Sequence, residues 1–114
     1  MIHRIIITKI IFERVMRLVN MYLKILNEKI LFSISEIEDK VEKNIIREEL
    51  IIPKSFEISR KLNYISRFIE MIIKQYKIRY VSITTENNIK DIETIKIEAV
   101  IEEAISNCGV EKCR

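Results

Sequence analysis

The sequence predicts a single small α/β domain, in which a three- to four-stranded sheet, at least partly parallel, is covered by about four helices. Two observations predict this class. Short runs rich in β-branched residues alternate with longer segments whose apolar residues recur at helical spacing. Gly and Pro occur once each among 114 residues, so we expect long elements joined by short connections.

Two strands and a helix are predicted in the first third of the chain. Residues 2–8, IHRIIIT, and residues 29–34, KILFSI, are apolar runs typical of buried strands. Residues 10–27 are predicted to form a helix, because apolar residues recur there at helical spacing. This apolar stripe contains Ile11, Val15, Leu18, Tyr22, Ile25 and Leu26, and it is widened by Val19 and Leu23.

The segment 36–50 is open to two interpretations. Ser35 and Glu38 form the S-x-x-E pattern of a capping box, which predicts a helix from residue 36. The same region, EKNIIREELII, also fits a strand, in which case the sheet gains a fourth strand within 41–52.

A long helix over residues 55–76 has the strongest periodicity of the chain. Pro53 ends the preceding segment, and Ser55 is a suitable N-cap. We expect one face of this helix to be the centre of the core. That face consists of Ile58, Leu62, Ile65, Ile69, Ile72 and Tyr76, of which the middle four are expected to be buried.

A strand, a polar turn and a helix are predicted after it. Residues 78–84, IRYVSIT, are rich in β-branched and aromatic residues, and the turn at 85–88, TENN, has no apolar side chain. Gly109, the only glycine, stands where the last helix should end. The domain is therefore expected to cover 1–107, with 108–114 as a loose tail. The inward stripe of the last helix is expected to contain Ile97, Ile101, Ala104, Ile105 and Cys108.

The charges are distributed in blocks along the chain. Residues 53–80 contain seven basic and two acidic side chains, whereas residues 81–114 contain four basic and seven acidic ones. A folded protein with mixed faces explains this pattern, and so does a basic surface for phosphates or head-to-tail self-association. If nucleic acid binds, the candidate contacts are Arg60, Lys61, Arg67, Lys74 and Arg79.

The cysteine and histidine content argues against two kinds of site. A structural zinc ion usually has four ligands, and Cys108, Cys113 and His3 leave such a site one ligand short. We therefore expect no metal there, and either two free thiols or a disulfide. Nucleophilic catalysis needs a histidine beside the nucleophile, and no motif accompanies His3. P-loop and dinucleotide sites are excluded because the chain has no Gly-rich loop.

Carboxylates are the remaining candidates for chemistry. Glu86 follows the end of the predicted strand 78–84, where open α/β sheets place their sites. Glu98 and Glu102 lie one turn apart on the next helix, so the three acids are candidates to hold Mg²⁺. The simpler interpretation is that the helix acids form the solvated face of an amphipathic helix.

The order of this strand, the TENN turn and the helix IKDIETIKIEAVIEEAI resembles the late strand–helix unit of ribonuclease H-like proteins, which include Holliday-junction resolvases. The resemblance implies a metal-dependent nuclease or an inactive relative. These families place an acid at this strand end, which falls on Glu86, and an Asp on the first strand. The predicted strands 2–8 and 29–34 contain neither Asp nor Glu.

The whole chain also resembles the small uncharacterised proteins of crenarchaeal viruses that infect Sulfolobus. Its length, its abundance of Ile, Lys and Glu, and the stretches MIHRIIITKIIFERV and KIRYVSITTENNIK carry this resemblance. It implies heat stability and a location in the host cytoplasm. We expect a cytoplasmic protein in any case, because neither a signal peptide nor an apolar stretch of about 18 residues is recognisable.

Two hypotheses about function follow. The first is a non-enzymatic interaction protein without a cofactor, which forms a homodimer and contacts nucleic acid or another protein. A homodimer is expected because a small sheet has two exposed edges and because the segments 10–27 and 55–76 are apolar over more than one stripe. The alternative is a ribonuclease H-like metal-dependent nuclease, with Mg²⁺ as its cofactor, or an inactive relative.

Overall fold

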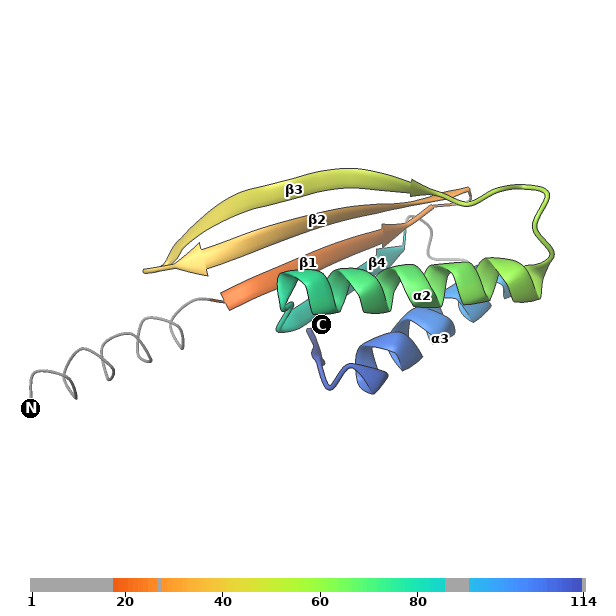
Figure 1. Ribbon diagram of the computed structural model, residues 1–114. Coiled ribbons are helices and arrows are strands. Elements are labelled where there is room, and N and C mark those ends of the chain that lie inside the picture. The colour runs from red at the N-terminus through yellow and green to blue at the C-terminus, as the bar shows by residue number, and fades with distance from the viewer. Residues whose placement is uncertain (1–17, 27, 86–90, 114) are drawn as a thin grey trace, which may run out of the picture.

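The computed structural model describes residues 18–26, 28–85 and 91–113, and the strand predicted at 2–8 lies outside them. The described strands form one five-stranded sheet in the order β3-β2-β1-β4-β5 (Figure 1). In chain order the elements are β1 (Leu18–Ile25), β2 (Lys29–Glu38), β3 (Val41–Ile51), α2 (Ile58–Tyr76), β4 (Tyr80–Thr85), α3 (Ile92–Asn107) and β5 (Glu111–Cys113).

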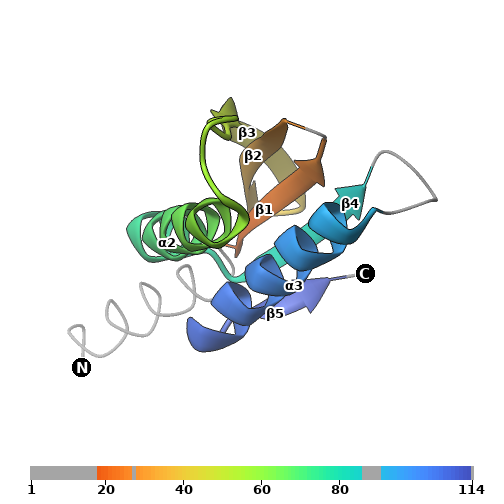
Figure 2. The same cartoon turned by 90° about the vertical axis from the view of Figure 1, so that its right-hand side faces the viewer.

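The sheet is mixed, which confirms the predicted α/β class. β1, β2 and β3 form an antiparallel meander, whereas β4 runs parallel to β1 and β5 runs parallel to β4. Parallel neighbours need a crossover connection, and α2 and α3 lie in the segments that lead into β4 and β5. Both helices pack side by side on the same face of the sheet, and neither covers the opposite face (Figure 2).

Alternation along β1 distinguishes the two faces of the sheet. Met21, Leu23 and Ile25 are buried in the core, whereas Tyr22 and Lys24 between them are exposed on the other face. We call this second face, which neither helix covers, the open face. The core also contains Ile30, Phe32 and Ile34 of β2, Val81 of β4, and Ile97, Ile101, Ala104 and Ile105 of α3.

A two-residue turn joins β2 to β3. Asp39 and Lys40 both have positive φ, 52° and 66°, as a type I′ hairpin turn requires. Because the twist of this turn matches the twist of the strands, β2 and β3 pair along their whole lengths, with one irregularity after Ile34. β3 has β2 as its partner and lies at the edge of the sheet.

The long helix predicted at 55–76 is confirmed as α2, although it begins after Glu57 and not after Ser55. Leu62 packs at the margin of the core. Phe68 meets Phe32 of β2 edge to face, with ring centroids 5.3 Å apart, which attaches the helix to the sheet. The side chains that α2 buries are Ile65, Ile69, Ile72 and Ile73.

Gly109 ends α3, as the sequence predicts. Its φ is 69°, and its N–H donates to the carbonyl of Ser106 over 3.0 Å. The N–H of Val110 donates to the carbonyl of Ile105 over 3.2 Å. This pair of bonds is the Schellman motif, in which a left-handed residue satisfies the last carbonyls of a helix.

Asp91 caps the other end of α3, accepting the N–H of Thr94 over 2.7 Å. Hydrogen bonds from the Thr94 side chain and backbone lower the pKa of Asp91 from its ordinary value of 3.8. A lowered pKa in the folded state means that the cap stabilises the fold at higher pH, and that this contribution is lost as pH falls through the folded pKa.

We therefore expect Asp91→Asn to lose less stability than the wild type on acidification, because Asn caps a helix without titrating. Thermal melts followed by circular dichroism at neutral pH and below the ordinary Asp pKa would measure this. Equal acid sensitivity in both proteins would contradict the prediction.

Four expectations about the elements need correction. Residues 18–25, which were predicted to belong to a helix at 10–27, form a strand. Residues 10–17 of that predicted helix lie outside the described residues. The helix predicted at 36–50 is wrong, since residues 36–38 end β2, residues 39–40 form the turn, and residues 41–50 belong to β3, the strand of the alternative interpretation. The described part of the chain has two helices, fewer than the four expected, and residues 111–113 of the expected loose tail form β5.

Candidate nucleic-acid interface

The exposed face of α2 has a row of cations alternating with aromatic and apolar side chains. We call this row the α2 stripe. Its members follow one another at intervals of three or four residues, which places them along one side of a helix. The α2 stripe consists of Phe56, which precedes the helix, and Arg60, Tyr64, Arg67, Met71 and Lys74.

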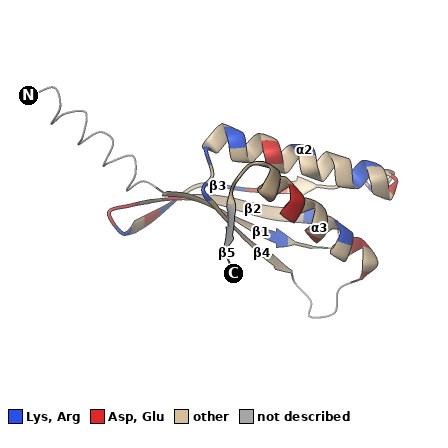
Figure 3. Cartoon of the chain, turned by 90° about the horizontal axis from the view of Figure 1, so that it is seen from below, with Lys and Arg blue, Asp and Glu red and all other residues tan. Residues whose placement is uncertain are grey.

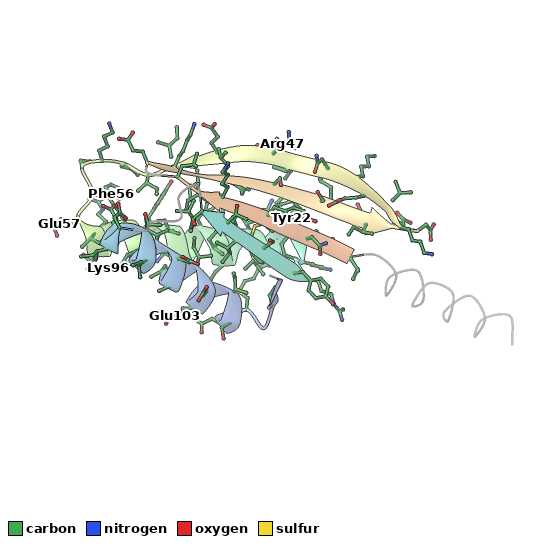
Figure 4. All side chains as sticks on the ribbon, turned by 180° about the vertical axis from the view of Figure 1, so that it is seen from behind. Tyr22, Arg47, Phe56, Glu57, Lys96 and Glu103 are labelled. Carbon is green, nitrogen blue, oxygen red and sulfur yellow. The ribbon has the colours of Figure 1, made fainter. Side chains whose placement is uncertain are left out.

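The beginning of the α2 stripe is held by aromatic contacts. The guanidinium carbon of Arg60 lies 4.1 Å from the centroid of the Phe56 ring. The Phe56 and Tyr64 rings meet edge to face, with centroids 5.9 Å apart and planes at 87°. These contacts join the three side chains into one cluster, and Figure 4 shows Phe56 at the end of the molecule where α2 and α3 begin.

The five basic residues predicted to contact nucleic acid fall into three groups. Arg60, Arg67 and Lys74 are exposed on the α2 stripe, and Figure 3 shows Lys and Arg positions spread along α2. Lys61 instead pairs with Glu93 of α3 over 3.0 Å, and its side chain is only 19% exposed. Arg79 lies beyond the helix, where its N–H donates to the Val19 carbonyl. The structure thus places three of the five along one line.

The open face of the sheet has a groove of about 500 Å³ across β1–β4. Its polar lining includes Tyr22, Lys24, Ser33, Arg47, Ser82 and Thr84, and Figure 4 labels Tyr22 and Arg47.

Charges of both signs lie in and around this groove. Glu49 pairs with Lys29 over 3.1 Å, and the Tyr22 hydroxyl donates to Glu42 over 2.8 Å. The groove is therefore less clearly suited to a polyanion than the α2 stripe. Sequence reasoning did not place Lys24 and Arg47 in one groove, because the segment of Lys24 was predicted to be helical and that of Arg47 was open to two interpretations.

The carboxylates of the nuclease hypothesis are only partly described. Glu86 lies outside the described residues, and Glu98 and Glu102 lie on α3. No three acid, cysteine or histidine side chains in the described ranges come close enough to hold a metal ion. The adjacent parallel strands β1 and β4 contain no Asp or Glu, and their open-face positions pair Tyr22 with Ser82 and Lys24 with Thr84.

Of the two cysteines, the structure describes the side chain of Cys108 alone. Cys108 is a partly buried free thiol, and burial together with the nearby Glu70 raises its pKa, while Lys74 acts in the opposite direction. The side chain of Cys113 and all of His3 lie outside the described residues.

Comparisons with known proteins identify the fold. No protein-family model and no curated protein matches the chain. Among solved structures, RuvC of Thermus thermophilus matches with a TM-score of 0.72 and 9% identity, over 83% of this chain and 59% of that one. The fold is that of RuvC. The same RuvC in complex with a Holliday junction substrate matches with a TM-score of 0.69 and 8% identity, over 83% of this chain and 62% of that one.

Two further solved structures share this fold with lower scores. The human cytomegalovirus terminase nuclease domain has a TM-score of 0.55 and 11% identity, over 82% of this chain and 45% of its own. The Ppx/GppA enzyme of Aquifex aeolicus also reaches 0.55, with 14% identity, over 85% of this chain and 36% of its own.

These matches support the resemblance to ribonuclease H-like proteins at the level of the fold. The chain spans 59% to 62% of the length of the RuvC structures that it matches. In the described part, neither α2 nor α3 is long and apolar enough to cross a membrane.

Proposed function

We propose that the protein binds nucleic acid through the α2 stripe and does not cleave it. The observation that carries this proposal is the alternation of Arg60, Arg67 and Lys74 with Phe56, Tyr64 and Met71 along one line, on which all but the half-buried Phe56 are exposed. Cations neutralise phosphates, while aromatic rings stack on bases. A surface that combines both suits a single strand, whose bases are free to stack, better than a duplex, whose bases are enclosed.

The shared fold supports the proposal in general terms. A Holliday junction is the substrate in one of the matching RuvC structures. A fold at this level of identity is compatible with other ligands, as the Ppx/GppA match illustrates. The α2 stripe, and not the fold, is therefore the observation that favours nucleic acid over other partners.

The second candidate function is metal-dependent cleavage, which the matches to RuvC and to the terminase nuclease domain favour. Such a reaction would use Mg²⁺ held by Glu86, Glu98 and Glu102. The resemblance to ribonuclease H-like proteins also calls for an Asp on the first strand, and β1 has Tyr22 and Lys24 at its exposed positions. A lysine there would repel a cation, so we place binding before cleavage.

Fluorescence anisotropy with labelled single-stranded DNA, single-stranded RNA and duplex DNA would test the proposal across salt concentrations. We expect the single strands to bind more tightly, with a logarithmic salt slope of about −2 for three phosphate contacts. The same mixtures with Mg²⁺ or Mn²⁺, run on a denaturing gel, test cleavage. Absence of binding at low salt would refute the proposal, and metal-dependent products would establish the nuclease instead.

Self-association is the other part of the proposed function, and β3 is the edge that we assign to it. Val41, Ile45 and Ile51 on this strand are 67%, 45% and 67% exposed. A second copy would pair with the same edge across a two-fold axis, and β3 has the basic and acidic side chains that a self-complementary contact requires. The apolar surface expected on the 55–76 helix is smaller than predicted, because Phe68 and Ile73 pack into the core.

We expect a homodimer at micromolar concentration, and a monomer when Val41 and Ile51 are both replaced by Lys. Charged side chains at those positions would have to be desolvated by edge pairing. Multi-angle light scattering would measure both masses. Ile95→Lys, which changes an exposed isoleucine on α3, is the matched control and should remain dimeric. A monomeric wild type would contradict the prediction.

The origin and location of the protein also stay predictions. The resemblance to crenarchaeal virus proteins implies heat stability and the host cytoplasm. A thermal melt is the direct test of the first of these.

A further inference from the structure

A pocket of about 640 Å³ lies where α2 and α3 both end. Its walls come from the end of α2, the segment that leads to β4, and the turn after α3. Lys74, Lys77 and Arg79 all line it, and among the side chains that the structure describes no acidic residue lines it. The groove on the open face, by contrast, has Glu48 and Glu49 among its lining residues. The described lining of the pocket at the helix ends is therefore positively charged.

The backbone around the pocket holds two of its basic residues, Lys77 and Arg79, in defined positions. Lys77 has a left-handed conformation, with φ 52° and ψ 49°, and its N–H donates to the carbonyl of Ile73. Glycine adopts this conformation at lower cost than lysine does, so the end of the helix does not by itself require a lysine at this position. Arg79 is tied to β1 by its N–H bond to the Val19 carbonyl, 2.8 Å long. The side chains of Lys77 and Arg79 thus start from defined positions on one wall.

A structural role accounts for part of this charge. Cations near the last turn of a helix interact favourably with its dipole, and Lys74 is the basic residue of the last turn of α2. Glu70, one turn earlier, partly offsets Lys74. Lys77 and Arg79 lie outside the helix, however, and they bring the number of cations around one cavity to three. α3 also ends at this pocket and has no basic residue in its last turn, so the two helix ends together contribute about one negative charge, which is less than the charge of the three cations.

Lys74 belongs both to the pocket and to the α2 stripe. From Arg60 to Lys74 the stripe extends for roughly 21 Å, at 1.5 Å per residue. The end of a strand that follows the stripe can therefore reach the pocket, where three cations meet. A terminal phosphate has more charge and more free oxygens than a phosphate within the chain, and a cluster of cations recognises that difference.

We propose that this pocket binds the terminal phosphate of the nucleic-acid strand that lies along the α2 stripe. The proposal rests on the proposed function and adds a preference for phosphorylated strand ends. Lys74, Lys77 and Arg79 supply the charge. The thiol of Cys108, in the opposite wall, is a natural reporter of occupancy, because a bound anion would shield it and disfavour its thiolate.

The test compares single-stranded oligonucleotides of about eight nucleotides, within the range of a small site, that carry a phosphate or a hydroxyl at the 5′ or the 3′ end. We expect one of the phosphorylated ends to bind roughly tenfold more tightly than its hydroxyl counterpart. Lys77→Asn should abolish this preference, and Arg79→Ala should reduce it. Asn tolerates the left-handed conformation, so the first variant removes the charge without the strain that most residues would introduce.

Alkylation of Cys108, followed by mass spectrometry of its peptide, gives a second readout. The preferred oligonucleotide should slow alkylation in the wild type and not in Lys77→Asn. Equal binding of phosphate and hydroxyl ends, with tight binding overall, would overturn the inference and leave the proposed function standing. Protection by tripolyphosphate without any end preference would assign the pocket to a free phosphate compound and would also overturn it. Failure of every oligonucleotide to bind would refute the proposed function itself.

Discussion

Replacing Ile69 with Ala is expected to lower the free energy of unfolding by about 2–5 kcal/mol. Ile69 is 0% exposed, at the centre of the face with which α2 covers the sheet. The substitution removes apolar contacts and leaves a cavity that the surrounding side chains only partly fill. A single domain of this size has a total stability of about 5–15 kcal/mol, so the loss is a large part of it.

Ile95→Ala is the matched control, because it makes the same chemical change on the other helix at a position that is 52% exposed. We expect it to change stability by no more than about 0.5 kcal/mol. Urea denaturation followed by circular dichroism would measure both variants. If Ile69→Ala cost no more stability than Ile95→Ala, the burial of Ile69 at the centre of the core would be contradicted.

The elements that could be predicted are those whose pattern admits one interpretation. In α2 the apolar residues recur over five turns at helical spacing, so its existence and the burial of Ile65, Ile69 and Ile72 follow from the sequence. Leu62, which was also expected to be buried, is only half-buried, and Ile73 is buried instead. Gly109 could be placed because a left-handed residue ends α3, and glycine adopts that conformation most easily.

β1 could not be predicted because its residues fit two periods. Leu18, Tyr22 and Ile25 recur at helical spacing, while Met21, Leu23 and Ile25 alternate as a strand requires. Local sequence does not choose between them, and pairing with β2 and β4 does. The β2–β3 hairpin could not be predicted for another reason. Its turn uses Asp39 and Lys40, without the glycine that usually marks a type I′ turn.

The candidate site divides in the same way. The basic residues of the α2 stripe could be found from the sequence, because a confident helix fixes which residues share its outer face. The separation of Lys61 from that face could not, because it depends on Glu93, which is distant in the chain. The pocket at the helix ends could not be found either, since Lys77 and Gly109 meet there only after α3 has folded back beside α2.

The largest functional effect is expected when Arg60, Arg67 and Lys74 are all replaced by Ala. These three side chains are exposed, so the fold should persist while the phosphate contacts are lost. Each contact to a single strand contributes about −0.7 to the logarithmic salt slope, and the slope should therefore fall from about −2 to nearly zero. Lys96→Ala, which removes an exposed cation from α3, should leave the slope unchanged, and Lys61→Ala should behave in the same way because Lys61 is engaged with Glu93.

Tyr64→Ala separates stacking from charge on the same surface. Stacking of one base on an aromatic ring contributes about 1–3 kcal/mol, so this variant should weaken single-strand binding by about 5- to 150-fold without changing the salt slope. Anisotropy titrations at several salt concentrations, with circular dichroism to confirm folding, measure both quantities. If Lys96→Ala reduced the salt slope as much as the triple variant does, the phosphates would contact basic residues over the whole surface of the protein and not only along the α2 stripe. A Tyr64→Ala variant that binds like the wild type would mean that the bases face away from α2, and that only phosphates are recognised.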